Sequence, residues 1–104
     1  MAQGQTPVMD ALIEINAVSL ARTQLDPRSL MLVRIAALIA ADAPISSYLL
    51  HVGPASEAGI SVGDVENILV AVAPIVGTPR SMAAVVRIAE ALDLALRLGS
   101  ADTE

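Results

Sequence analysis

The side chains that could carry chemistry are few, and the most reactive of them lie in one short stretch. His51 is the only histidine of the chain, and it follows Ser47 by four residues and Tyr48 by three. In a helix, the four-residue spacing places the side chains of Ser47 and His51 on one face. Histidine ordinarily gains or loses a proton near neutral pH, so His51 could act as a general acid or base. The alternative is a partly buried histidine that is hydrogen-bonded to a neighbour and has no chemical role.

Ser47 and Tyr48 could assist His51 as a nucleophile and a proton donor. A serine nucleophile needs a base, and that base needs a third group that orients it. The sequence contains no nucleophile-elbow motif and indicates no carboxylate that would orient His51. Ser46 and Ser47 are therefore better explained as residues in the first turn of a helix.

Arg34 is the second unusual side chain, because it interrupts an otherwise uncharged stretch from Leu30 to Ala41. A guanidinium that leaves water must find a carboxylate or a bound anion. One interpretation is that Arg34 binds the carboxylate of a substrate. The other is that it forms an ion pair with Asp64, with Glu66 or with a residue of another subunit.

The composition argues against several classes of function. The chain has no cysteine, which excludes disulfides, thiolate metal sites and thiol redox chemistry. A single histidine falls short of a transition-metal site, and no glycine-rich loop resembles a phosphate cradle, so we expect no metal and no cofactor. The net charge is −5 with one aromatic residue and no basic run, which argues against nucleic-acid binding.

The apolar content is high for a chain of 104 residues, of which 55% are apolar and 16% are charged. Charged residues recur too often for a membrane span, which needs roughly 20 consecutive apolar residues. The first residues lack the order of a signal peptide, so a cytoplasmic location is the default expectation. The excess apolar surface is therefore expected to be buried between copies of the chain in a homo-oligomer.

Proline, glycine and capping residues divide the chain into five helical stretches, with no strand pattern and no repeat. Their expected limits are 7–21, 27–41, about 42–58, 61–76 and 78–98. Asp26 and Ser61 are expected N-caps, and Gly59 and Gly99 are expected to end the third and fifth helices. Pro54 is expected to kink the third helix.

The second stretch is apolar nearly all round and is predicted to be the central buried helix. Because the side chains are mostly small, the sequence predicts a compact all-α bundle of five helices with close crossings. Residues 1–104 form a single domain, and 1–6 and 100–104 are predicted to be flexible ends.

From Leu25 to about Leu92, the sequence resembles the carboxymuconolactone decarboxylase and alkyl hydroperoxidase D family. The order and spacing of His51, Gly59, Gly77 and Pro79 carry most of this resemblance. It implies a bundle of the alkyl hydroperoxidase D type with a family-like core over 25–98. It also implies assembly as a trimer or hexamer, which agrees with the apolar excess.

The resemblance implies an altered active site, in which only His51 is retained from the polar residues of the family. The peroxidase branch has two cysteines where this chain has Pro44 and Ser47, which rules out thiol peroxidase chemistry. The nearer, lactone decarboxylase branch keeps the histidine. The other replaced positions are Met31 or Leu32 for a glutamate of the peroxidase branch, and Asn67 and Ile75 for an acid and a tyrosine of the decarboxylase branch.

Two functions follow from the sequence. In the first, the protein binds or acts on a small carboxylated or lactone-like metabolite, with His51 and Ser47 as catalytic residues and Arg34, Tyr48 and Asn67 as substrate-binding residues. In the second, it is a non-catalytic oligomeric scaffold or binding protein whose former pocket is filled with apolar side chains. The two differ in whether His51 faces a cavity with Arg34 nearby or is covered by leucine and valine.

Overall fold

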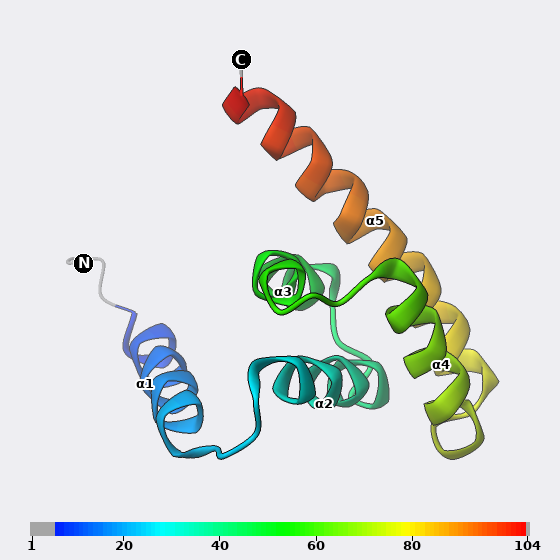
Figure 1. Cartoon of the computed structure of the whole chain (residues 1–104), viewed down its shortest axis with the longest axis horizontal. Coiled ribbons are helices and arrows are strands. Elements are labelled where there is room, and N and C mark those ends of the chain that lie inside the picture. Colours follow the sequence, from blue (N-terminus) through cyan, green and yellow to red (C-terminus); the bar gives the residue numbers. More distant parts are fainter. Residues whose placement is uncertain (1–5, 104) are drawn as a thin grey trace.

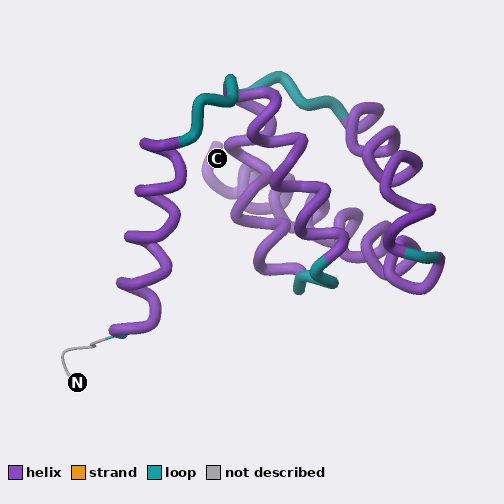
Figure 2. Tube along the Cα trace, turned by 90° about the horizontal axis from the view of Figure 1, so that it is seen from below, coloured by secondary structure: helices purple, strands orange, loops and turns teal. Residues whose placement is uncertain are grey.

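The computed structural model describes residues 6–103, and side chains as far as residue 99, as five α-helices joined by short loops (Figure 1). No strand occurs in this part of the chain (Figure 2), so the predicted all-α class is confirmed. None of the described helices is both long and apolar enough to cross a membrane. The helices are α1 (Pro7–Arg22), α2 (Pro27–Ala40), α3 (Ile45–Glu57), α4 (Val62–Val76) and α5 (Thr78–Thr103).

Local capping interactions set the starts of α2 and α4 where the sequence predicts them. The Asp26 carboxylate accepts the backbone N–H of Ser29 at 2.8 Å, and Pro27 occupies the first turn, where its missing N–H has no cost. At α4, the Ser61 hydroxyl accepts the N–H of Asp64, and the Asp64 carboxylate accepts the N–H of Ser61. This reciprocal capping box satisfies two N–H groups that the helix itself leaves free.

Two predicted helix limits are wrong. α3 begins at Ile45, with Pro44 as its N-cap, because the chain turns at Asp42, whose φ of +57° is incompatible with a helix. α5 continues through Gly99 to Thr103, because Gly99 does not adopt a positive φ and a glycine inside a helix costs only about 1 kcal/mol. The backbone of 100–103 is therefore helical, whereas 1–5 and 104 lie outside the described residues.

Helices α2–α5 form the packed body of the protein, in which α2 and α5 each contact the other three helices. Met31, Ile35 and Ile39 recur every four residues and form the buried face of α2. Val33 is 54% exposed, so only one side of this apolar helix is buried. The core around it consists of Ile35, Ile39, Ala43, Tyr48, Ile68, Ala84 and Ala91.

α1 stands apart from this body (Figure 1). None of its side chains is buried, and no Cα atom of α1 lies within 8 Å of a Cα atom in another helix. Arg34 of α2 connects the two parts by donating to Asn16 Oδ1 at 2.6 Å and to Ser19 Oγ at 2.9 Å. The radius of gyration, 15.0 Å, accordingly exceeds the value of about 13 Å for a compact domain of this length. The five helices thus form a four-helix body with an appended arm.

Asp64 is paired with Arg28, and not with Arg34 as one reading of the sequence suggests. Arg28 of α2 donates to the two Asp64 carboxylate oxygens at 3.0 and 3.2 Å, and to the Gly59 carbonyl oxygen at 3.0 Å. These hydrogen bonds, reinforced by those from Ser61, hold the pKa of the Asp64 carboxyl well below its usual range. The pair joins the start of α2 to the start of α4.

We predict that replacing Asp64 by asparagine makes stability less sensitive to acid. Because the folded state lowers the pKa of Asp64 below its unfolded value of about 3.9, the ionised carboxylate stabilises the fold fully above that pH. Its contribution is lost as the pH falls through the folded-state pKa. The Tm of the wild type should exceed that of Asp64→Asn near neutrality, and the difference should shrink progressively below about pH 4.

Asp93→Asn is the matched control, since it removes the exposed carboxylate that pairs with Arg97 and should change the Tm little. A Tm difference between wild type and Asp64→Asn that stays constant from neutral to strongly acidic pH would contradict the assignment.

Candidate functional site

A partly open cavity of about 360 Å³ lies between α3, α4 and α5, with Ile35 of α2 in its wall. Most of its lining is aliphatic and comes from the facing sides of these helices. Four lining residues carry polar side chains, namely Tyr48, His51, Ser56 and Ser61. An apolar cavity with a few polar groups is the usual form of a small-molecule site.

His51 is half-buried in the cavity wall, and its ring is oriented by the backbone of its own helix. The Nδ1 atom lies 2.8 Å from the Ser47 carbonyl oxygen. Because a carbonyl oxygen can only accept, Nδ1 must carry the hydrogen and donate it. In the neutral ring, Nε2 then holds the free lone pair. The geometry therefore selects the tautomer in which Nε2 can take up a proton.

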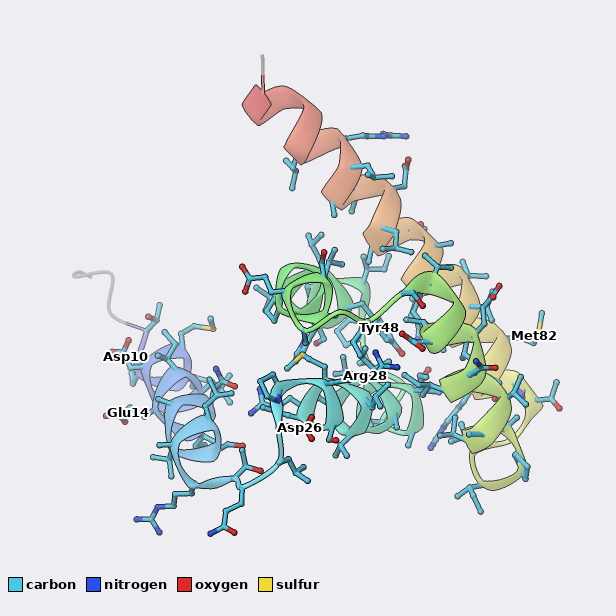
Figure 3. The ribbon with its side chains drawn as sticks, viewed as in Figure 1. Asp10, Glu14, Asp26, Arg28, Tyr48 and Met82 are labelled. Carbon is cyan, nitrogen blue, oxygen red and sulfur yellow. The ribbon has the colours of Figure 1, made fainter. Side chains whose placement is uncertain are left out.

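Tyr48 is the second polar residue of the cavity and is only 5% exposed. Its side chain is labelled in Figure 3. Its hydroxyl has no hydrogen-bond partner among the described residues. Burial raises the pKa of Tyr48, with Arg87 opposing and Asp42 reinforcing the shift, so the hydroxyl keeps its proton. A buried donor without a partner is costly, so the hydroxyl of Tyr48 is a destabilising feature of the fold as it stands.

Tyr48 and His51 lie three residues apart on α3 and therefore share one face of that helix. Both line the same cavity. A ligand held there would contact the imidazole of His51 and the side chain of Tyr48. A neutral imidazole beside a ligand can remove a proton from it.

The other residues singled out from the sequence lie outside this cavity. Ser47 contributes its carbonyl oxygen to His51, but its side chain is not part of the lining. Arg34 is directed at α1, where it is hydrogen-bonded to Asn16 and Ser19. Asn67 is exposed on α4. The structure thus brings His51 and Tyr48 together and places Arg34 and Asn67 elsewhere.

Two further polar residues, Ser56 and Ser61, line the cavity, but the sequence pattern did not indicate either as part of a site. Ser61 is recognisable as a helix cap, but only the packing of α4 against α3 places it at the cavity. Ser56 follows His51 by five residues, a spacing that does not put two side chains on one helical face. Among the described residues, no group of three or more histidine, aspartate or glutamate side chains could hold a metal ion.

Tyr48→Phe should leave the protein as stable as the wild type or more stable by up to about 1 kcal/mol. The substitution keeps the buried ring and removes a hydroxyl that lacks a partner. Chemical denaturation would measure the change in the free energy of unfolding. Ile39→Ala serves as the reference, since it empties a fully buried position and should cost about 2–5 kcal/mol. A loss above about 1 kcal/mol in Tyr48→Phe would mean that the hydroxyl has a stabilising partner.

Comparison with known proteins agrees with this architecture. Residues 6–91 match the carboxymuconolactone decarboxylase family. No curated protein and no solved structure gives a significant match. The matched range includes α1, whereas the resemblance seen in the sequence begins only at Leu25. The range also contains every residue of the cavity lining except Leu92. The chain therefore belongs to the carboxymuconolactone decarboxylase family.

Proposed function

We propose that this protein binds a small lactone-like or related carbonyl compound in the cavity and acts on it by acid/base chemistry at His51. One observation supports the proposal: an imidazole whose tautomer is fixed by the Ser47 carbonyl lines the same apolar cavity as Tyr48, whose buried hydroxyl has no partner among the described residues. Family membership supports the class of ligand, because the family is named for an enzyme that acts on a carboxylated lactone.

In the proposed step, Nε2 of His51 removes a proton from the carbon next to the ligand carbonyl. The C–H bond breaks, its electron pair moves towards the carbonyl oxygen to form an enolate, and the ring becomes an imidazolium. In this proposal, the Tyr48 hydroxyl, which is buried without a partner in the unliganded structure, turns towards the enolate oxygen and donates a hydrogen bond where the negative charge develops. Return of the proton from Nε2 to the ligand restores the neutral ring. The aliphatic wall lowers the local polarity around the reacting atoms and so strengthens both interactions.

The position of Ser47 favours proton transfer over nucleophilic attack by serine. Its side chain does not line the cavity, whereas its carbonyl oxygen orients the imidazole. A covalent mechanism would need a serine hydroxyl within reach of both ligand and base. The absence of cysteine equally leaves this chain without the thiolate that the peroxidase chemistry of the family requires.

Hydrogen–deuterium exchange tests the proposed step directly. In D2O, the wild type should accelerate deuterium incorporation next to the carbonyl of γ-butyrolactone, as followed by NMR. His51→Gln removes the base and Tyr48→Phe removes the donor, so each should slow the catalysed exchange by at least about 100-fold. Ser46→Ala, an exposed change on the same helix, is the control and should exchange like the wild type.

Equal exchange in wild type, His51→Gln and protein-free buffer would contradict a catalytic role. The non-catalytic scaffold or binding protein would then be the better description of this family member.

We further propose that the protein assembles with copies of itself as a trimer or hexamer. Its exposed surface is 6983 Å², whereas a compact monomer of 10.7 kDa exposes about 5500 Å². The excess of roughly 1500 Å² approaches twice the 800 Å² that one partner buries in a standard interface.

α1 is the main source of this excess. Asp10 and Glu14 lie on the side of α1 that points away from the body (Figure 3), so the apolar side of the helix is turned inward without being covered. Seven of its apolar side chains are 47–71% exposed, namely Val8, Met9, Leu12, Ile13, Ile15, Val18 and Leu20. Apolar exposure on this scale is typical of a surface that another subunit covers.

Light scattering on the full chain tests the assembly. The wild type should have a mass of about 32 or 64 kDa, three or six times 10.7 kDa. Leu12→Glu places a charge on the apolar side of α1 and should lower the mass without loss of helix content, because this side chain is not part of the core. Gln24→Glu adds the same charge in the loop after α1 and should leave the mass unchanged. A wild-type monomer at micromolar concentration would exclude the assembly.

A further inference from the structure

We infer that Arg22 of a second copy of this chain completes the cavity, where it binds the carboxylate of a carboxylated lactone. The inference rests on the proposed function, because it concerns the ligand of the same cavity. It replaces the expectation from sequence, in which Arg34 of the same chain binds the carboxylate. Three observations carry it: the described lining contains no arginine, Arg22 pairs with none of the described residues, and two apolar helix faces lie uncovered.

The cavity of a single chain lacks the cation that a carboxylate needs. The chain has six arginines and no lysine, and all six arginines lie in the described part. None of them lines the cavity. A carboxylate in apolar surroundings is strongly disfavoured unless a cation pairs with it. His51 cannot be that cation while its neutral ring acts as the base. The cation must therefore come from a residue outside the lining.

Arg22 is the arginine that the fold of the single chain does not use. It lies exposed in the last turn of α1 and forms no hydrogen bond or ion pair with the described residues. The other five arginines are engaged within the chain, namely Arg28 with Asp64, Arg34 with Asn16 and Ser19, Arg80 with the Ala40 carbonyl, Arg87 with Asp42, and Arg97 with Asp93. A bound carboxylate can thus recruit Arg22 without breaking an existing pair.

In its own chain, Arg22 lies at a different face of α3 from the cavity that contains His51. The residues beside it, Leu20 and Thr23, line a second cavity of about 360 Å³ together with Pro54 and Glu57 of α3. In Figure 1, α1 is also well separated from α4 and α5, which form the other walls of the first cavity. Arg22 therefore reaches this cavity only in another copy of the chain.

The apolar wall of the cavity continues along α5 beyond the packed body. Ile88 and Leu92 line the cavity, and Leu96 follows one turn later on the same face, where it is 71% exposed. Leu94 and Leu98 are exposed as well. In Figure 1, this end of α5 extends past α3 and α4, and no other described helix covers it. An apolar strip thus leads from the cavity to an uncovered helix end.

α1 of a second copy fits this end of α5. Ile15, Val18 and Arg22 share one face of α1, and Ile15 and Val18 are 64% and 51% exposed in the single chain. When α1 lies along α5, Ile15 and Val18 cover Leu96, and Arg22 lies at the mouth of the cavity. The contact joins two different faces, so it repeats head to tail and can close into a ring. A ring agrees with the trimer or hexamer proposed above.

A matched pair of probes isolates the charge, namely γ-butyrolactone-γ-carboxylate and its methyl ester, which share the same ring. NMR titration of the full chain at neutral pH gives both dissociation constants. Arg22→Gln should weaken binding of the carboxylate by at least about 10-fold and leave binding of the ester nearly unchanged, because it removes only the cation. Arg97→Gln is the control, since Arg97 is another exposed arginine but pairs with Asp93 of its own helix, and it should change neither constant.

Mixed oligomers show whether Arg22 acts between copies. Isotope-labelled Arg22→Gln chains are unfolded and refolded together with an excess of unlabelled wild-type chains, so that most labelled chains have wild-type neighbours. Each neighbour then supplies Arg22 to the labelled cavity. The NMR signal of the labelled His51 should therefore shift at carboxylate concentrations that leave oligomers of Arg22→Gln alone unchanged.

Carboxylate binding that Arg22→Gln leaves unchanged would overturn the inference, and so would a wild-type monomer. Weak binding by the labelled chains in mixed oligomers would assign Arg22 to the cavity of its own chain, which also contradicts it. Loss of carboxylate binding in Arg22→Gln and its recovery in mixed oligomers, without any deuterium exchange, would support the inference and contradict only the proposed catalysis. Binding of neither probe would overturn both, and it would place the failure at the cavity itself.

Discussion

Burial of one face of α2 is the interaction on which the rest of the structure depends. Ile39 is completely buried, and Ile35 belongs to the same core cluster. This face holds α3, α4 and α5 around a common centre, and the small side chains of Ala84 and Ala91 let α5 lie close to its neighbours. The cavity is the space that these packed helices leave between them. Its position is therefore fixed by the core, and its wall is aliphatic because it is the edge of that core.

A single helix supplies the groups that could carry chemistry. α3 provides the imidazole of His51, the hydroxyl of Tyr48 and the Ser47 carbonyl that orients the ring. Because these groups belong to one helix, movements of the loops do not change the distances between them. A site of this kind is preorganised. The arginines, in contrast, hold the elements together: Arg28 joins α2 to α4, and Arg87 joins α5 to the turn at Asp42. This division leaves the lining of the cavity without an arginine.

The exposed apolar side chains of α1 distinguish this helix from the packed body formed by the other four helices. The body has its own core, whereas α1 has no buried residue although it is part of the range that matches the family. The hydrogen bonds from Arg34 to Asn16 and Ser19 keep this helix in place beside α2. A helix that retains apolar side chains without covering them is stabilised by tertiary or quaternary packing more than by its own propensity. The high apolar content of the sequence thus consists of apolar side chains exposed at the surface as well as those buried in the core.

The sequence by itself determined the five helices, apart from two of their limits, and the one-face relation of Ser47 and His51. Capping at Asp26 and Ser61 and the spacing along α3 depend on atoms within about four residues, so they can be read without knowing the fold. Only the tertiary structure decided that Asp64 pairs with Arg28, that Arg34 faces α1, and that α4 and α5 complete the cavity wall. It also decided that α5 continues past Gly99. Ion-pair partners and cavity walls come from residues far apart in the chain, and their meeting is set by helix packing, which no local pattern encodes.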